Sequence, residues 1–270
     1  MQQQKVSRSA LNVALARTHL TSLGVVNDPY ARQMLPPNHR RVAAALQLPG
    51  LRRLGRYSTV PYLAARTLFF DTFISDALDD GLRQVVVLGA GYDSRAWRMA
   101  RPGVTFFEVD QPATQGDKRT RAPDGGPVYV PADLTDPSLA EKLVHAGHQP
   151  QEPTAFTVEG LTIYLTREAA AALLGRLYDL GSTGSRLAVS FESGFERQPI
   201  TRRLMTAYYR SRGETLRFRL RSEEAPSFLS QTGWTIDKLQ TAERLENEHL
   251  SKTKLAGRLN TTSFAVDARK

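Results

Sequence analysis

From residue 84 onward, short β-rich runs alternate with helix-like stretches, and this pattern constrains the fold more than any other feature of the sequence. Strands that are joined through helices run parallel with right-handed crossovers, so the pattern predicts a doubly wound, mostly parallel sheet. The β-rich runs cover residues 84–89, 105–110, 127–133, 155–160 and 185–192. Between and after them we expect helices near residues 94–100, 112–121, 137–146 and 167–180.

Two further β-rich runs, 233–239 and 259–268, lie late in the sequence with no long helix between them. Neighbouring strands without a crossover helix pair antiparallel, so we expect a hairpin at one edge of the sheet. The whole pattern predicts an α/β fold built on a seven-stranded sheet.

The region before the first strand has a helical pattern that is broken by "NDPY" (27–30), "LPPNH" (35–39) and "STVPY" (58–62). We expect residues 1–81 to form a helical N-terminal cap within the same domain, and residues 82–270 to form the core. An arginine-rich stretch at about 195–221 is expected to be a helical lid insertion, and a helix at 222–233 follows it.

The formal net charge of +9 is concentrated in two segments. Residues 1–56 carry nine Lys and Arg against Asp28 alone, and residues 197–221 carry eight Arg against Glu214. Two basic segments over one sheet favour a lid for an anionic small-molecule substrate, although a solvated surface is the plain alternative. The charge also suggests an RNA-binding protein or an RNA-modifying methyltransferase. The sequence has no aromatic-rich RNA-binding strand motif, so we expect no nucleic-acid partner.

The composition also limits the compartment and the chemistry. No apolar run approaches the roughly 20 residues of a membrane span, and the start "MQQQKVSRSA" lacks the apolar stretch of a secretory signal. The sequence has no cysteine, which excludes disulfides, thiolate metal sites and a cysteine nucleophile. We therefore expect a cytoplasmic chain with no membrane partner and no metal site.

The first expected strand leads into a glycine turn in "VVVLGAGYDSRAWRM" (85–99). Gly89 and Gly91 allow a ligand to approach the backbone closely. The fingerprint of NAD- and FAD-binding proteins requires a third glycine at position 94, where this chain has Ser94. The turn therefore argues against an NAD-dependent oxidoreductase, the main rival enzyme class.

Acidic residues follow at the ends of the next three expected strands, where parallel sheets bind ligands. Glu108 and Asp110 share a strand face by alternation, and a carboxylate there can accept hydrogen bonds from both ribose hydroxyls of an adenosine. Asp133 can read an adenine amino group, whereas Asp136 resembles an ordinary helix start. Glu159 ends an apolar strand and needs a cationic partner. Phosphate groups would require positive charge and more glycine at these strand ends, whereas acids favour an adenosine that carries a cationic group. S-adenosylmethionine is such a ligand, so we expect it as the cofactor.

Six segments keep a characteristic order and spacing across about 140 residues. They are "DPYARQML" (28–35), "YLAARTLFFDTFI" (62–74), "VVVLGAGYDSRAWRM" (85–99), "FFEVDQP" (106–112), "VPADLTD" (130–136) and "TVEGLTIYLT" (157–166). Together they resemble the leucine carboxyl methyltransferase family, especially its bacterial branch that acts on small molecules such as polyketides. The resemblance implies a class I, Rossmann-like, S-adenosylmethionine-dependent O-methyltransferase of secondary metabolism.

The resemblance carries cofactor roles onto matching positions. Arg66 would pair with the methionine carboxylate, Asp110 would hold the ribose, and Glu159 would lie near the methionine amino group. Gly89 would abut the cofactor, and Asp133 with Leu134 would flank the adenine. The full expected cofactor site is Arg66, Gly89, Ala90, Gly91, Asp110, Gln111, Asp133, Leu134, Glu159 and Gly160.

Arg66 lies among apolar residues and needs an anion if it is buried, although it could instead extend to water from a helix surface. By the resemblance, Arg17 falls where the family often has a basic residue near the substrate carboxylate and the cofactor. We expect Arg95 to be structural and to brace the first loop, which contains the glycine turn. The role of Asp93 stays open between capping the next helix and touching the cofactor.

The expected reaction is in-line transfer of the sulfonium methyl group to an oxygen. A carboxylate acceptor needs no general base, whereas a phenol or alcohol does, and none of the five histidines lies in a matched motif. We therefore expect a carboxylate or acidic hydroxyl as acceptor, although a binding scaffold without activity stays open. No catalytic residue is certain; the candidates are Arg17 and Tyr164, and the expected substrate-binding residues are Arg17, Tyr57, Tyr62, Tyr164 and Tyr208.

Overall fold

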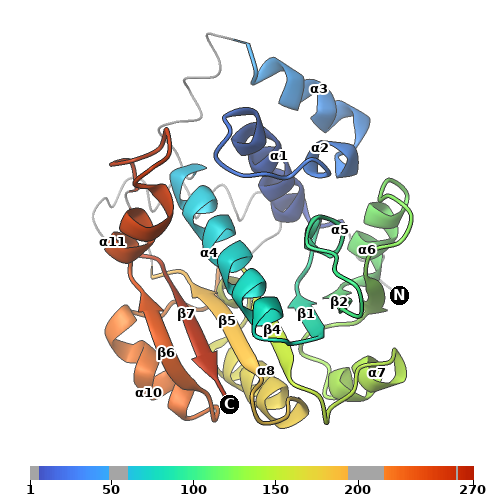
Figure 1. The fold of residues 1–270 in the computed structure, drawn as a ribbon, viewed down its shortest axis with the longest axis vertical. Coiled ribbons are helices and arrows are strands. Elements are labelled where there is room, and N and C mark those ends of the chain that lie inside the picture. Colours follow the sequence, from blue (N-terminus) through green and yellow to red (C-terminus); the bar gives the residue numbers. More distant parts are fainter. Residues whose placement is uncertain (1–5, 49–59, 194–215, 260) are drawn as a thin grey trace.

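The computed structural model describes residues 6–48, 60–193, 216–259 and 261–270. Within these residues the chain forms one seven-stranded sheet of order β3-β2-β1-β4-β5-β7-β6 (Figure 1). The first five strands are parallel, and β7 pairs antiparallel with both β5 and β6. The strands are β1(Gln84–Leu88), β2(Thr105–Asp110), β3(Val128–Pro131), β4(Thr154–Val158), β5(Arg186–Phe191), β6(Thr235–Gln240) and β7(Phe264–Arg269).

This sheet confirms the predicted doubly wound fold with an antiparallel pair at one edge. The last strand begins later than the sequence predicts, at Phe264 and not at residue 259. The backbone N–H groups of Gly257 and Leu259 instead donate to the carboxylate of Glu246, at 2.5 Å and 3.0 Å. This local capping removes residues 257–259 from the strand ladder.

The helices lie close to their predicted positions. The predicted breaks also hold, since Asp28 accepts a hydrogen bond from the backbone of Ala31 at 2.9 Å and Pro36 precedes the next helix. The helices are α1(Arg8–Ser22), α2(Ala31–Met34), α3(Pro37–Ala45), α4(Val60–Asp79), α5(Arg95–Arg98), α6(Pro112–Arg119), α7(Leu139–His145), α8(Arg167–Leu180), α10(Ala225–Ser230) and α11(Ala242–Leu245). Short turns are the 3-10 helices η2(Thr162–Tyr164) and η3(Ser222–Glu224) and the π-helical η4(Glu246–Leu250).

Most of the predicted lid, residues 194–215, lies outside the described residues, and residues 216–221 form no helix. The prediction of a helical lid is therefore untested for its main part. The division into a cap at 1–81 and a core at 82–270 also stays a prediction.

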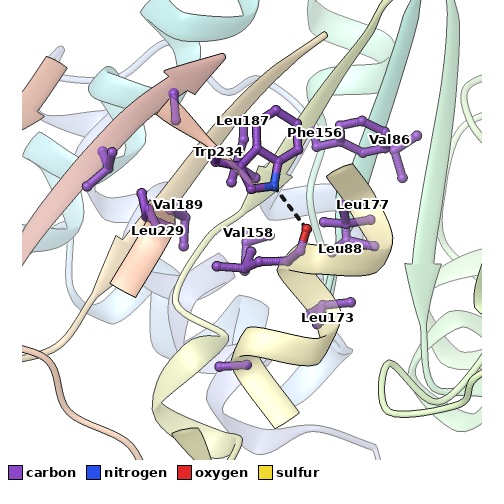
Figure 2. Packing of buried hydrophobic residues seen from close by; sticks show 14 of the residues in the cluster. Val86, Leu88, Phe156, Val158, Leu173, Leu177, Leu187, Val189, Leu229 and Trp234 are labelled. Atoms are coloured by element: carbon purple, nitrogen blue, oxygen red, sulfur yellow. Dashed lines mark hydrogen bonds between the residues drawn. The ribbon is translucent and has the colours of Figure 1, made fainter. Parts of the chain in front are cut away.

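Two apolar layers hold the helices against the sheet. One layer joins α4 and α11 to one face, and the other joins α7, α8 and α10 to the opposite face. Trp234 fixes the second layer, because its buried indole N–H donates to the carbonyl of Leu174 in α8 at 2.9 Å (Figure 2). β1 and β4 are buried along their whole length, as expected for central strands covered on both sides.

Helices α1 to α3 lie over the end of the sheet at which β1, β4 and β5 finish (Figure 1). The contact is close, since a Cβ atom added at Gly91 would lie 2.9 Å from the Cβ of Ala10 in α1. Tyr92 packs into the small apolar cluster beneath these helices. No helix among the described residues has the length and apolar character that a membrane crossing demands.

Candidate functional site

The glycine turn after β1 is tied to the end of β2. Gly89 and Gly91 have φ values of +65° and +52°, a region that side chains other than glycine rarely adopt. The N–H of Gly89 donates to the carbonyl of Val109 at 2.8 Å, and the N–H of Gly91 donates to the Asp110 carboxylate at 2.6 Å. These two hydrogen bonds fix the turn against the carboxyl end of β2.

Asp110 is the acid of β2 that reaches this edge. One of its oxygens accepts from Gly91, and the other accepts from the N–H of Gln111 at 2.6 Å. Burial raises its pKa, while these two N–H donors oppose the shift. Each carboxylate oxygen has two lone-pair sites, so each keeps one for a ligand donor.

Glu108 does not share that position, although alternation places it on the same strand face. It is fully buried and pairs with the ammonium group of Lys118 at 2.5 Å, beneath the rings of Trp97 and Tyr129. Burial raises the pKa of Glu108 to about 7 despite this cation. We call Glu108 and Lys118 the closed pair.

Asp133 and Leu134 follow β3 at the same edge. Asp133 is exposed, and its Oδ1 accepts from the backbone and the hydroxyl of Thr135, at 2.8 Å and 2.7 Å. Leu134 is half-buried and packs against the second apolar layer. Asp136 binds the N–H of Ser138 at 2.9 Å just before α7, as an ordinary helix start does.

The anion that Arg66 requires is Glu159 itself. Arg66 Nε lies 3.1 Å from Glu159 Oε1, and Arg95 Nη1 lies 2.7 Å from Glu159 Oε2. Burial alone would raise the pKa of Glu159, but the two guanidinium groups hold it below its ordinary value. Gly160 has φ +63°, and a Cβ there would lie 2.7 Å from Arg66 Nη1, so the guanidinium rests on the glycine. The predicted alternative, an Arg66 that extends to water, is wrong.

Arg95 binds Asp93, in the loop that contains the glycine turn, and this contact agrees with its expected structural role. Its side chain is completely buried and contacts Asp71 at 2.7 Å, Asp93 at 2.5 Å and Glu159 at 2.7 Å. Burial would lower its pKa, but the three carboxylates raise it well above the ordinary value. Asp71 also binds both terminal nitrogens of Arg98.

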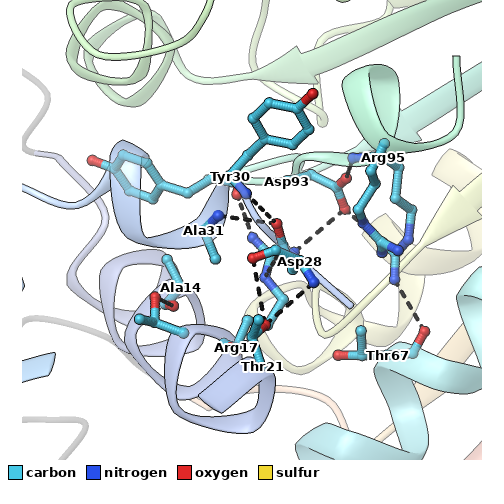
Figure 3. Close-up of polar contacts among 12 residues, drawn as sticks. Ala14, Arg17, Thr21, Asp28, Tyr30, Ala31, Thr67, Asp93 and Arg95 are labelled. Atoms are coloured by element: carbon cyan, nitrogen blue, oxygen red, sulfur yellow. Dashed lines mark hydrogen bonds and ion pairs between the residues drawn. The ribbon is translucent and has the colours of Figure 1, made fainter. Parts of the chain in front are cut away.

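Asp93 joins this group to the N-terminal helices (Figure 3). Its Oδ1 accepts from the N–H of Arg95, the first residue of the short helix α5, at 2.6 Å. Its Oδ2 lies 3.7 Å from Arg17 Nη1, and Arg17 also contacts Asp28 at 3.4 Å and the carbonyl of Tyr92. Burial opposes ionisation of Asp93, but Arg95 and Arg17 hold its pKa far below the ordinary value. This hydrogen bond to the start of α5 agrees with the first of its two expected roles, and contact with the cofactor stays a prediction.

Glu192 belongs to the same group and was missed by the sequence reasoning. Its Oε1 accepts from the hydroxyl of Tyr62 at 2.9 Å and lies 3.6 Å from Arg66 Nη1, while its Oε2 accepts from Ser263 at 2.6 Å. Its sequence context, "SFESGFE", contains no motif that singles it out. The arginine network is defined as Arg17, Arg66, Arg95 and Arg98 with Asp28, Asp71, Asp93, Glu159 and Glu192.

The predicted substrate-binding residues are only partly placed. Tyr62 lies in α4 one turn from Arg66, and its ring is 5.5 Å from that guanidinium group. Tyr164 is half-exposed in η2, just after Glu159 and Gly160. Tyr57 and Tyr208 lie outside the described residues.

The structure thus places acids, arginines and a glycine turn at the carboxyl ends of β1, β2 and β4. Asp110 offers hydrogen-bond acceptors, and the pair of Arg66 and Glu159 offers one charge of each sign. Among the described residues, no group of three or more His, Cys, Asp and Glu side chains could hold a metal ion. The arrangement suits a ligand that has a polar ring and a zwitterionic end.

Comparison with known proteins extends this picture. The family model described as "Leucine carboxyl methyltransferase" matches residues 8–178. A protein of Mycolicibacterium smegmatis named "Putative S-adenosyl-L-methionine-dependent methyltransferase" is 37% identical over 206 residues, covering 68% of this chain and 64% of that relative, just under two thirds of its length. A protein of Mycobacterium avium with the same name is 32% identical over 272 residues, which are 91% of this chain and 86% of that one.

Solved structures show the same fold. A DUF574 family protein from Streptomyces avermitilis aligns with a TM-score of 0.63 at 19% identity, over 94% of this chain and 96% of that one. A protein from Thermobifida fusca, described as a "putative methyltransferase", aligns with a TM-score of 0.56 at 18% identity, over 96% and 97% of the two chains. The fold is that of the class I methyltransferases, and by sequence this chain belongs to the leucine carboxyl methyltransferase family.

Proposed function

We propose that this chain transfers the sulfonium methyl group of S-adenosylmethionine to an oxygen of a small anionic acceptor, either a carboxylate or an acidic hydroxyl. The observation that carries the proposal is the placement of Asp110 at the end of β2 and of the Arg66–Glu159 pair at the end of β4, on either side of the strand β1 that leads into the glycine turn. Family membership and the names of the relatives support S-adenosylmethionine as the cofactor.

The adenosine end of the cofactor fits the carboxyl ends of β2 and β3. The lone pairs that Asp110 keeps suit the two ribose hydroxyls, and Asp133 with Leu134 suits an adenine edge and face. Gln111 continues the ribose side, while Gly89, Ala90 and Gly91 let the cofactor approach the backbone. These assignments follow the expectation from the sequence.

The methionine end fits Arg66 and Glu159. A zwitterion carries an ammonium and a carboxylate, so it complements an arginine and a glutamate that already lie 3.1 Å apart. Gly160 lets the Arg66 guanidinium group pack directly against the backbone after β4, because a side chain at this position would collide with it. Arg66 and Glu159 therefore bind the amino-acid end of the cofactor.

Methyl transfer to a carboxylate needs alignment and the exclusion of water. The acceptor oxygen forms a bond to the methyl carbon, the carbon–sulfur bond breaks, and its electron pair stays on sulfur, which leaves S-adenosylhomocysteine and a methyl ester. A carboxylate is ionised at neutral pH, so no proton has to be removed. We assign Tyr62 and Tyr164 to the acceptor side, and the eight arginines within residues 197–221 favour an anionic acceptor.

The contacts of Arg17 favour a supporting role over the expected role as a substrate ligand. Its guanidinium group is buried between Asp28, Asp93 and the carbonyl of Tyr92. These contacts use its charge within the protein, and they fasten helix α1 to the glycine turn. We therefore propose Arg17 as a support of the turn, and Tyr164 as the stronger candidate for contact with the acceptor.

Ligand-dependent thermal unfolding tests the proposal. S-adenosylmethionine and S-adenosylhomocysteine should each raise the melting temperature, and NAD should not. Asp110→Asn and Arg66→Met should each weaken cofactor affinity by at least about tenfold while the unliganded fold persists. Stabilisation by NAD alone would overturn the proposal. Labelled methyl transfer to a panel of carboxylates and phenols then identifies the acceptor class.

A further inference from the structure

Glu192 ties together three segments that are far apart in the sequence. It follows β5 directly, at the sheet edge where the cofactor site lies. Its two oxygens accept from Tyr62 in α4 and from Ser263 just before β7, and the same carboxylate faces Arg66. The side chain is 20% exposed, so it borders the site. Neither the family motifs quoted above nor the proposed reaction assigns it a role.

We propose that Glu192 is a positioning residue that orients Arg66 toward the carboxylate of the cofactor's methionine end and holds the Tyr62 hydroxyl away from it. This inference rests on the proposed function. Glu159 binds Arg66 at Nε, and Glu192 lies 3.6 Å from Nη1 on another side of the same planar group. With Gly160 against it as well, the guanidinium plane is fixed. Neither of these two ion pairs, both between described residues, uses Nη2, and we assign this nitrogen to the incoming anion.

Glu192 also decides what Tyr62 can offer. The Tyr62 hydroxyl has one proton, and it donates that proton to Glu192 at 2.9 Å. Burial and the charge of Glu192 raise the pKa of Tyr62 well above its ordinary value, so the phenol stays protonated. Its oxygen can then only accept a hydrogen bond from a ligand, which a carboxylate cannot provide. The cofactor carboxylate is therefore directed to Arg66 and away from Tyr62.

A purely structural Glu192 would behave differently. Its bond to Ser263 joins the end of β5 to the start of β7, and loss of that bond would lower stability. Such a loss would leave the affinity of the folded protein for the cofactor unchanged. Affinity and stability therefore separate the two roles.

Four variants test the inference, with S-adenosylmethionine and S-adenosylhomocysteine titrated calorimetrically well below the melting temperature. Glu192→Ala removes every contact, and Glu192→Gln keeps hydrogen-bonding atoms but removes the charge. Ser263→Ala removes only the link to β7. Glu141→Gln, at an exposed acid of α7, is the matched control. The melting temperature of each unliganded variant is recorded alongside.

Glu192→Ala should weaken the affinity for both ligands by about tenfold, and Glu192→Gln by less. Ser263→Ala and Glu141→Gln should stay within about twofold of the wild type. In an Arg66→Met background, Glu192→Ala should have no further effect on affinity, because its action passes through Arg66.

Wild-type affinity in Glu192→Ala would overturn the inference and leave the proposed function standing. An equal loss in Glu192→Ala and Ser263→Ala would also overturn it, since the effect would then come from the link to β7. If the wild-type chain binds neither ligand, the proposed function is wrong and the inference is wrong with it.

Discussion

Two buried groups of charges flank the glycine turn, and they differ in how far they are closed. The closed pair of Glu108 and Lys118 is 1% and 0% exposed, and aromatic rings cover it. The arginine network has arginines that are shared among several carboxylates, and its outer members Glu159 and Glu192 are 12% and 20% exposed. One group is sealed within the protein, whereas the other opens at the sheet edge.

The difference separates stability from binding. A sealed pair can only affect the free energy of unfolding, because no ligand reaches it, and its burial costs solvation energy that the pairing offsets. A network with exposed carboxylates can exchange some of its contacts for those of a charged ligand. We therefore expect changes at the closed pair to alter stability alone, and changes at the outer network to alter ligand affinity.

The largest effect is expected at the centre of the network. Arg95→Met removes a fully buried cation and leaves Asp71, Asp93 and Glu159 with one counter-charge fewer. Breaking a buried pair in this way costs about 3 to 5 kcal/mol of unfolding free energy. Chemical denaturation of the unliganded variant measures this loss. A loss below about 1 kcal/mol would show that the network is more hydrated than its burial indicates.

Lys118→Met is expected to come next and to depend on pH. The variant leaves Glu108 buried without its cation, at a cost of about 2 to 4 kcal/mol at pH 8. The pKa of Glu108 is already raised to about 7, so the folded state binds a proton that the unfolded state has released. Stability therefore falls as pH rises from the ordinary glutamate pKa through the folded one. Loss of Lys118 raises that pKa further and steepens the fall.

Denaturation of the wild type and of Lys118→Met at pH 6 and pH 8 checks this prediction. The stability gap between them should be smaller at pH 6. Cofactor affinity per folded molecule should change by less than about threefold. A variant that loses affinity and keeps its stability would remove the distinction between the two groups.

Gly160→Ala should have an intermediate effect at the outer edge of the network. The φ of +63° disfavours any side chain, and the new Cβ would lie 2.7 Å from Arg66 Nη1. The backbone strain costs about 1 kcal/mol, and the displaced guanidinium weakens cofactor binding. In free-energy units, the loss of cofactor affinity measured by calorimetric titration should exceed the loss of stability calculated from the change in melting temperature. Gly175→Ala, in helix α8 with open space around it, is the control.

The sequence predicts the positions of the strands and of the glycine turn better than it predicts which buried charges pair with one another. Alternating runs locate the parallel strands, and glycine at 89 and 91 with Asp110 locates the turn, because these depend on local spacing. Sequence spacing does not reveal that Glu108 is sealed by Lys118, since helix packing decides it. Glu192 is likewise found only when the fold brings α4, β5 and the residues before β7 together. The pairing partners of buried charges are set by tertiary contacts.

The smallest effect is expected at an exposed pair, which calibrates the comparison. Arg101 Nη1 lies 2.7 Å from Asp79 Oδ1, a distance as short as those within the network, but the two side chains are 35% and 63% exposed. Water screens the attraction and ordering two long side chains costs entropy, so Arg101→Gln should change stability by less than about 0.5 kcal/mol. Moderate salt should reduce even that difference, whereas the loss in Arg95→Met should hardly respond to salt. Denaturation at two ionic strengths measures both. Equal salt sensitivity in the two variants would mean that distance, and not burial, sets the strength of these pairs.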